Sequence, residues 1–179
     1  MCRLEMDTRK KLRGIPRRMR ALAKWAESFR NWFPSDEELN PDHGLRHWKL
    51  PVHQSLVEGR STTPAIQRDC AQLLIDACGF LIANKPETAQ SVRVTGIVCL
   101  PSMFASELCI FTSPTLYRDY VSERDNEFQT LARISGRSLA SEWGLRLPPG
   151  VDELGIAEVI HRDESQWVGE LWYFGEVLD

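Results

Sequence analysis

Three of the four histidines in this sequence gather in one short stretch, where they could bind a metal. His43, His47 and His53 lie beside Asp42, and imidazole and carboxylate groups are zinc ligands. His43 and His47 would share one face of a helix. The prolines and the glycine within residues 41–51 favour a loop instead, so we expect no metal site here.

Glu170 is a second residue that could do chemistry. On a β-strand its side chain shares a face with Val168, Trp172 and Phe174, where burial would favour a protonated carboxyl group. Such a group could act as a general acid or base, or anchor an arginine. The alternative is an exposed or salt-bridged glutamate on an edge strand. The spacing places no second carboxylate or histidine beside it, so the sequence supports no acid–base pair.

The stretch after Gly150 combines acidic and aromatic side chains, with Arg162 as its one basic residue against eight acids. Aromatic residues rimmed by charge are typical of protein interfaces, and one sign of charge speeds the capture of an oppositely charged partner. The predicted partner-binding residues are Glu158, Asp163, Glu164, Trp167 and Glu170. The alternative is that the aromatic residues form the core and the acids are ordinary surface.

The opposite end of the chain is basic. Residues 1–30 hold ten Lys and Arg against three acids, a balance of +7, so a net charge of −3 leaves −10 on the remaining residues. Arg13, Arg17, Arg18 and Arg20 could bind anions, because a helix is expected to begin among them and its dipole disfavours cations in the first turn. A nucleic acid is one possible partner of residues 1–30. The alternatives are a solubilising tail or a contact with the acidic C-terminal strands.

Familiar catalytic and cofactor-binding motifs are absent from the sequence. It contains no G-x-G-x-x-G, no phosphate-binding P-loop, no G-x-S-x-G and no H-E-x-x-H, so we expect no cofactor and favour a binding protein over an enzyme. The five cysteines form no C-x-x-C pair and are typical of small buried residues. With neither a run of about 18 apolar residues nor an apolar N-terminal segment, we expect a cytoplasmic protein that does not bind membranes.

The chemistry-bearing residues must be positioned by a sheet, and Val92–Thr112 is expected to be its central hairpin. Alternation puts Val94 and Val98 on one face with Leu108 of the partner strand. Gly96 indicates a bulge or the close approach of another group. Two amphipathic helices are expected to cover the sheet, one over residues 16–33 and one over residues 63–84.

The remaining apolar runs predict further strands at residues 48–52, 156–161 and 167–174, and two short helices at residues 116–121 and 127–143. Strands and helices do not alternate, so we expect an α+β fold. The predicted fold is an antiparallel sheet of about five strands with a central hairpin, covered by two main amphipathic helices. Residues 1–15 are expected to be a basic flexible lead-in, and residues 16–179 a single α+β domain.

Several stretches resemble a bacterial domain-of-unknown-function family. They are KKLRGIPRR at 10–18, WKLPV at 48–52, VTGIVCLPSMFASELCIF at 94–111 and GELWYFGE at 169–176. The resemblance implies a single cytoplasmic α+β domain of bacterial origin and brings no catalytic residues with it. Small families of this kind are similar to those encoded beside polymorphic toxins, where they serve as immunity proteins.

The leading hypothesis is therefore a cytoplasmic immunity-type binding protein. It would neutralise a cognate bacterial toxin, a basic domain, by occluding the toxin's active site with the acidic end of the chain. One alternative is a nucleic-acid-associated protein that uses the basic N-terminal segment. Another is an enzyme with an unrecognised site around Glu170.

Overall fold

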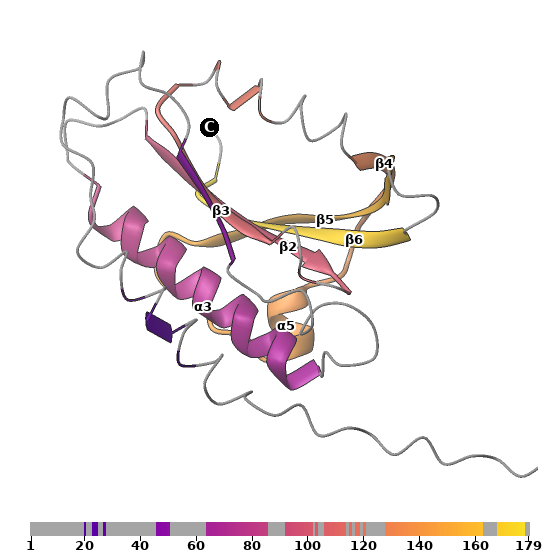
Figure 1. Ribbon diagram of the computed structural model, residues 1–179, viewed down its shortest axis with the longest axis horizontal. Helices are drawn as coiled ribbons and strands as arrows, with labels where there is room; N and C mark the ends of the chain where they lie inside the picture. The colour runs from indigo at the N-terminus through magenta and orange to yellow at the C-terminus, as the bar shows by residue number, and fades with distance from the viewer. Residues whose placement is uncertain are drawn as a thin grey trace, which may run out of the picture.

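A single antiparallel sheet organises the described part of the chain, and two helices lie on one of its faces (Figure 1). This computed structural model describes residues 20, 23, 24, 27, 46–50, 64–85, 92–101, 103, 106–113, 115, 117, 118, 120, 128–162 and 168–177. The strands are β1 (Arg46–Lys49), β2 (Arg93–Leu100), β3 (Glu107–Phe111), β4 (Phe128–Ile134), β5 (Asp152–His161) and β6 (Val168–Gly175); the helices are α3 (Pro64–Ala83) and α5 (Leu139–Trp143). The predicted α+β fold is confirmed, with six described strands where about five were expected.

The strand order is β1-β3-β2-β6-β5-β4, so β2 and β6 are the central strands. β2 and β3 form the predicted hairpin, in which Val94 lies opposite Ile110 and Gly96 opposite Leu108. β6 pairs with β2 on one side and with β5 on the other. It therefore joins the β2–β3 hairpin to the β4–β5 pair.

The sheet face toward α3 carries the main core. The two-residue period of a strand puts Val94 and Val98 of β2 on this face together with Leu108 and Ile110 of β3, and all four are at most 1% exposed. The buried residues of α3 are Ile66, Cys70, Ala71, Leu74, Ile75, Ala77, Cys78, Gly79 and Leu81. Each large apolar side chain buried here contributes about 1.5–3 kcal/mol relative to exposure, so the contact between α3 and the sheet stabilises the fold.

Gly96 allows two central strands to pack a large aromatic side chain. A Cβ atom at Gly96 would lie 2.1 Å from Cζ of Phe174, a separation that packed atoms do not reach. Phe174 is the residue opposite Gly96 on β6, and the centroid of its ring lies 4.8 Å from that of Trp172. The close approach expected at Gly96 is thus made by the Phe174 ring.

The strand β4 corrects the predicted helix over residues 127–143. Phe128, Leu131 and Ile134 recur at three-residue steps, which is typical of a helix. In the structure these residues belong to a strand that has a register shift between Thr130 and Ala132. A bulge inserts an extra residue and so breaks the two-residue alternation, which is why the apolar spacing imitates a helix. The short helix α5 begins only at Leu139.

The opposite face of the sheet carries a smaller core. It consists of Ile97, Cys99, Phe128, Ala157, Val159 and Leu171, with Tyr120 and Tyr173 packed against it. Residues 115, 117, 118 and 120 are helical, and the rings of Tyr117 and Tyr120 meet that of Phe111 at centroid distances of 5.0 and 5.2 Å.

Of the helix predicted over residues 16–33, the four described residues are all helical. The predicted lead-in, residues 1–15, lies outside the described residues.

Candidate functional site

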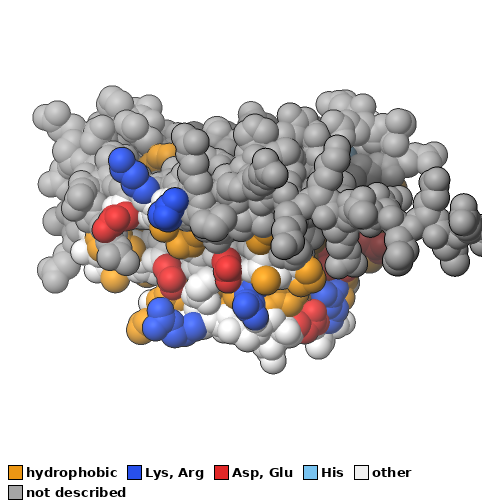
Figure 2. Space-filling view, turned by 60° about the horizontal axis from the view of Figure 1, so that its bottom comes forward, with side chains coloured by type: hydrophobic (Ala, Val, Ile, Leu, Met, Phe, Trp, Pro, Cys, Tyr) orange, Lys and Arg blue, Asp and Glu red, His pale blue; other side chains and the backbone are white. Residues whose placement is uncertain are grey.

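The helical side of the molecule carries charges of both signs. Figure 2 shows Lys and Arg side chains interspersed with Asp and Glu side chains on this side, so the described residues there form no one-sign field. A different arrangement occurs at the far end of the sheet, where the β5–β6 register places Glu158 directly opposite Glu170. Both side chains are half-buried. Like charges in directly opposed strand positions repel each other. The Glu158–Glu170 pair is therefore unfavourable unless a cation compensates it.

The two glutamates lie in one row of side chains across the sheet. The row runs from Leu100 of β2 through Glu170 and Glu158 to Ala132 of β4. It is on the same face as the buried Trp172 of β6, because side chains two positions apart share a face. The two glutamates thus lie on the sheet face that α3 packs against, on the strands β5 and β6.

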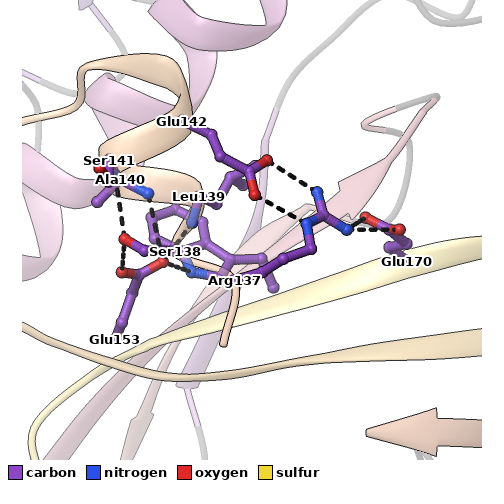
Figure 3. A network of polar contacts seen from close by, with 9 residues as sticks. Arg137, Ser138, Leu139, Ala140, Ser141, Glu142, Glu153 and Glu170 are labelled. Atoms are coloured by element: carbon purple, nitrogen blue, oxygen red, sulfur yellow. Dashed lines mark hydrogen bonds and ion pairs between the residues drawn. The ribbon is translucent and has the colours of Figure 1, made fainter. Parts of the chain in front are cut away.

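Arg137 compensates one of the two charges. Its Nη1 atom donates to both carboxylate oxygens of Glu170, at 2.8 and 2.9 Å. Its Nε and Nη2 atoms donate to the two oxygens of Glu142, at 2.8 and 2.9 Å. Figure 3 shows the guanidinium held between the two carboxylates. The hydrogen bond from Arg137 lowers the pKa of the Glu142 carboxyl group, so Glu142 stays ionised at neutral pH.

A second glutamate network fixes α5 and with it Glu142. Oε1 of Glu153 accepts hydrogen bonds from the backbone N–H groups of Leu139 and Ala140, at 2.7 and 3.2 Å, and from Nε1 of Trp172 at 2.7 Å. Its Oε2 atom accepts from Oγ of Ser138 at 2.5 Å (Figure 3). These donors include the otherwise unsatisfied amides of a helix N-terminus. Glu153 is therefore a structural anchor and not a free carboxylate.

Glu158 is the carboxylate of this region that Arg137 does not reach. Among the described residues, no Lys, Arg or His forms an ion pair or hydrogen bond with it. Within the described residues, the region thus carries three carboxylates, those of Glu142, Glu158 and Glu170, and the guanidinium of Arg137. We call these four residues, together with Ala132, Ile160 and Val168, the carboxylate surface.

The apolar members of the carboxylate surface are accessible. Val168 is 51% exposed, Ala132 is exposed and Ile160 is half-buried. Among the described elements, α3 packs mainly against β2, β3 and β6, and the exposed side chains of the carboxylate surface lie toward β4. An open mixture of apolar and acidic side chains suits contact with a protein that presents basic groups, since it offers both contact area and complementary charge.

The other polar groups of the described chain offer little chemistry. In the described ranges no three His, Cys, Asp or Glu side chains come together as a metal site, and no described helix is long and apolar enough to cross a membrane. Burial raises the pKa of the Cys70 thiol to about 12 and that of Cys109 well above its usual range, so neither is a nucleophile at neutral pH. A hollow of about 470 Å³ is lined by Asp76, Phe80, Arg146 and Pro148. The hollow is open. Its two charged residues compensate each other, because Nη2 of Arg146 lies 3.7 Å from Oδ1 of Asp76.

A comparison with known proteins identifies the family. The model of the family described as Protein of unknown function (DUF3916) matches residues 23–176. The chain belongs to this family. The resemblance to a domain-of-unknown-function family that the sequence shows is thereby confirmed for DUF3916. No curated protein and no solved structure matches the chain.

Of the residues predicted to bind a partner in this DUF3916 chain, the structure brings Glu158 and Glu170 together. Asp163, Glu164 and Trp167 lie outside the described residues, as do Arg13, Arg17 and Arg18 of the predicted anion-binding group. Arg20 is described and is an exposed helical residue. The histidine cluster is described only for the backbone of His47, within β1.

Two further outcomes concern residues that the sequence left open. Glu170 is bound by Arg137, which fits both the predicted arginine anchor and the salt-bridged alternative. The edge strand of that alternative is wrong, because β6 lies between β2 and β5. Trp172 and Phe174 are fully buried core residues and not interface aromatics.

Sequence reasoning missed Arg137 and Glu142. The only signal near them is the run Ser138–Glu142, in which Ser138 is a good N-cap residue and Glu142 an acid in the first turn.

Proposed function

We propose that this DUF3916 chain binds a basic protein partner through the carboxylate surface. The observation that carries the proposal is the Glu158–Glu170 pair, two half-buried carboxylates in directly opposed positions with Arg137 bound to one of them. Such an arrangement costs free energy in the isolated protein. A cation that a partner places beside Glu158 would remove the repulsion and would be attracted by the whole group of carboxylates.

The partner that this chemistry favours is an enzyme with a basic cleft. Toxins that act on nucleic acids must bind polyanions, and they do so with Lys and Arg side chains. A surface with carboxylates at its centre and apolar side chains around them can cover such a cleft and exclude its substrate. On this basis we infer an immunity-type role, in which the chain neutralises a cognate toxin in the cytoplasm by occluding its active site.

The test first identifies the partner and then reverses one charge of the carboxylate surface. A tagged full-length chain is used to capture proteins from its host lysate after nuclease treatment, and the affinity of the purified partner is measured by titration calorimetry. Glu158→Lys should weaken binding at least tenfold, about 1.4 kcal/mol, and should abolish protection of cells that express the partner. The matched control is Asp69→Lys, which reverses a 54% exposed carboxylate on α3 and should leave affinity within twofold.

Two results would overturn the proposal. One is an unchanged affinity and unchanged protection in the double variant Glu158→Lys, Glu170→Lys, provided that circular dichroism shows it folded. The other is recovery of nucleic acid in place of a protein, lost after nuclease treatment or at raised salt, which would move the function to the basic residues 1–30.

A further inference from the structure

The edge strand β4 has a backbone edge that no described strand covers. β4 is the last strand in the sheet order and pairs with β5 alone among the described strands. Along Gln129–Arg133 the side chains are exposed, and no backbone hydrogen bond joins these five residues to any described part of the chain other than β5. Exposed edge strands are templates for the addition of a further strand from another chain.

This edge adjoins the carboxylate surface. Ala132 of β4 lies opposite Glu158, which in turn lies opposite Glu170. A strand added beside β4 would lie about 4.8 Å from it and therefore about 9.6 Å from β5. The side chain between an added strand and Glu158 is only the methyl group of Ala132, which is exposed. The four-carbon stem of a lysine can lie across that methyl group and bring its ammonium group to Glu158.

The neighbouring rows specify what should flank this cation. On one side of the Ala132–Glu158 row, Ile134 lies opposite Ile156; on the other side, Gln129 lies opposite Ile160. On an added strand, the side chain two positions from the lysine would face the Ile134–Ile156 row. The bulge between Thr130 and Ala132 places Gln129 three residues from Ala132, so the regular two-residue step does not extend to the Gln129–Ile160 row. An apolar side chain suits the place beside Ile134, because this residue is half-buried and offers apolar area.

We propose that the basic partner adds an extended segment to the sheet as a strand along β4, with a Lys or Arg facing Ala132 and an apolar side chain two positions away, facing Ile134. This rests on the proposed function and names the way in which the partner binds. The backbone hydrogen bonds of the β4 edge supply affinity, and Glu158 selects the cation.

A second copy of the chain does not supply this cation. The one basic residue of β4 is Arg133, which lies opposite Ala157 and therefore on the other face of the sheet from Ala132. When two β4 strands pair antiparallel about a two-fold axis, each face continues onto the same face of its partner. Arg133 of the copy would then stay away from Glu158, so charge complementarity favours a different chain.

The test uses random dodecapeptides displayed on phage and selected on the full-length protein. The selected peptides should share a Lys or Arg with an apolar or β-branched residue two positions away. On binding of a synthetic peptide of this sequence, alternate backbone amides within residues 129–133 should become at least tenfold more protected from hydrogen exchange. Ala132→Lys supplies the cation from the chain itself and blocks the path, so it should weaken peptide binding at least tenfold. Ser141→Lys, at an exposed position of α5, is the matched control and should not.

The outcomes separate this inference from the proposed function. One outcome is that basic peptides bind and that Glu158→Gln weakens their binding, while the amides of residues 129–133 stay unprotected. Strand addition is then wrong, and the carboxylate surface still stands as a binding site. If peptide binding is the same in Glu158→Gln as in the unchanged protein, both are wrong. If the amides are already protected without peptide and gel filtration shows a dimer at micromolar concentration, the occupant of the edge is a second copy and the inference is overturned.

Discussion

Replacing Glu158 with glutamine should make the protein more stable. The amide would keep the size and hydrogen-bonding capacity of the side chain but remove one of two like charges in directly opposed positions of β5 and β6. Nothing stabilising is lost in the described structure, because Arg137 is bound to Glu170 and Glu142 and not to Glu158. The same substitution should weaken partner binding. A residue that costs stability and serves binding in this way is what a functional surface predicts.

The expected gain follows from the geometry of the strand pair. Directly opposed residues have Cβ atoms about 4.5–5.5 Å apart, and such pairs contribute roughly 0.2–1 kcal/mol, with like charges destabilising. Two unit charges about 6 Å apart in water repel by about 0.7 kcal/mol. Glu158→Gln should therefore raise the free energy of unfolding by about 0.5 kcal/mol. Glu170→Gln relieves the same repulsion but breaks a partly exposed pair with Arg137, worth about 0.5–1 kcal/mol, so it should bring no gain.

The measurement compares the two variants under identical conditions. Urea unfolding followed by circular dichroism gives the free energies, and thermal unfolding should show Glu158→Gln about 1–2 °C above the unchanged protein. In 1 M salt the Debye length falls to about 3 Å, so the gain of Glu158→Gln should largely disappear. The reasoning is refuted if Glu158→Gln destabilises the protein at low salt, or if its effect equals that of Glu170→Gln.

Three further predictions test the rest of the structure. Glu153→Ala should lower the free energy of unfolding by about 3 kcal/mol, because it leaves the buried indole N–H of Trp172 and two helix amides without their acceptor; urea unfolding measures this. Burial raises the pKa of the Cys70 thiol from 9.0 to about 12, so above pH 9 the unfolded chain loses this proton first and stability falls by up to about 1.4 kcal/mol per pH unit; Cys70→Ala should make the decline between pH 8 and 11 shallower. Gly96→Ala should cost about 1–3 kcal/mol, because its Cβ would meet the Phe174 ring at 2.1 Å.

Each of these has a control. For the anchoring glutamate it is Asp152→Ala, which removes an exposed neighbouring carboxylate and should change stability by less than about 0.5 kcal/mol. For the thiol, an unchanged slope in Cys70→Ala would contradict the reasoning. For the glycine, Phe174→Leu should restore part of the stability lost in Gly96→Ala, and strict additivity of the two changes would show that the ring is not responsible.

The parts of the fold that could be predicted are those that a local pattern determines. The α3 stripe repeats every three or four residues, and β2 is a short apolar run that is buried on both faces, so these elements follow from the local pattern. The strand β4 could not be predicted in this way, because the register shift between Thr130 and Ala132 removes the alternation that identifies a strand.

The site could be predicted only in part, because its geometry depends on contacts between distant residues. Glu158 and Glu170 were identified from the company of acidic and aromatic residues. Their opposition depends on the β5–β6 register, and a shift of one residue would put them on opposite faces. Arg137 reaches Glu170 across 33 positions of sequence, and no spacing rule connects such residues.

The strand order also determines how this chain can fold. β6 is made after the other described strands, yet it lies at the centre of the sheet and joins β2 to β5. Until β6 arrives, the β2–β3 hairpin exposes an edge of β2, a strand in which seven of eight residues end up buried. Pairing residues about 80 positions apart carries a loop-closure cost that precedes the gain. We therefore expect slow refolding, on the millisecond to second scale, with the unprotected β2 edge as the place where incompletely folded chains associate.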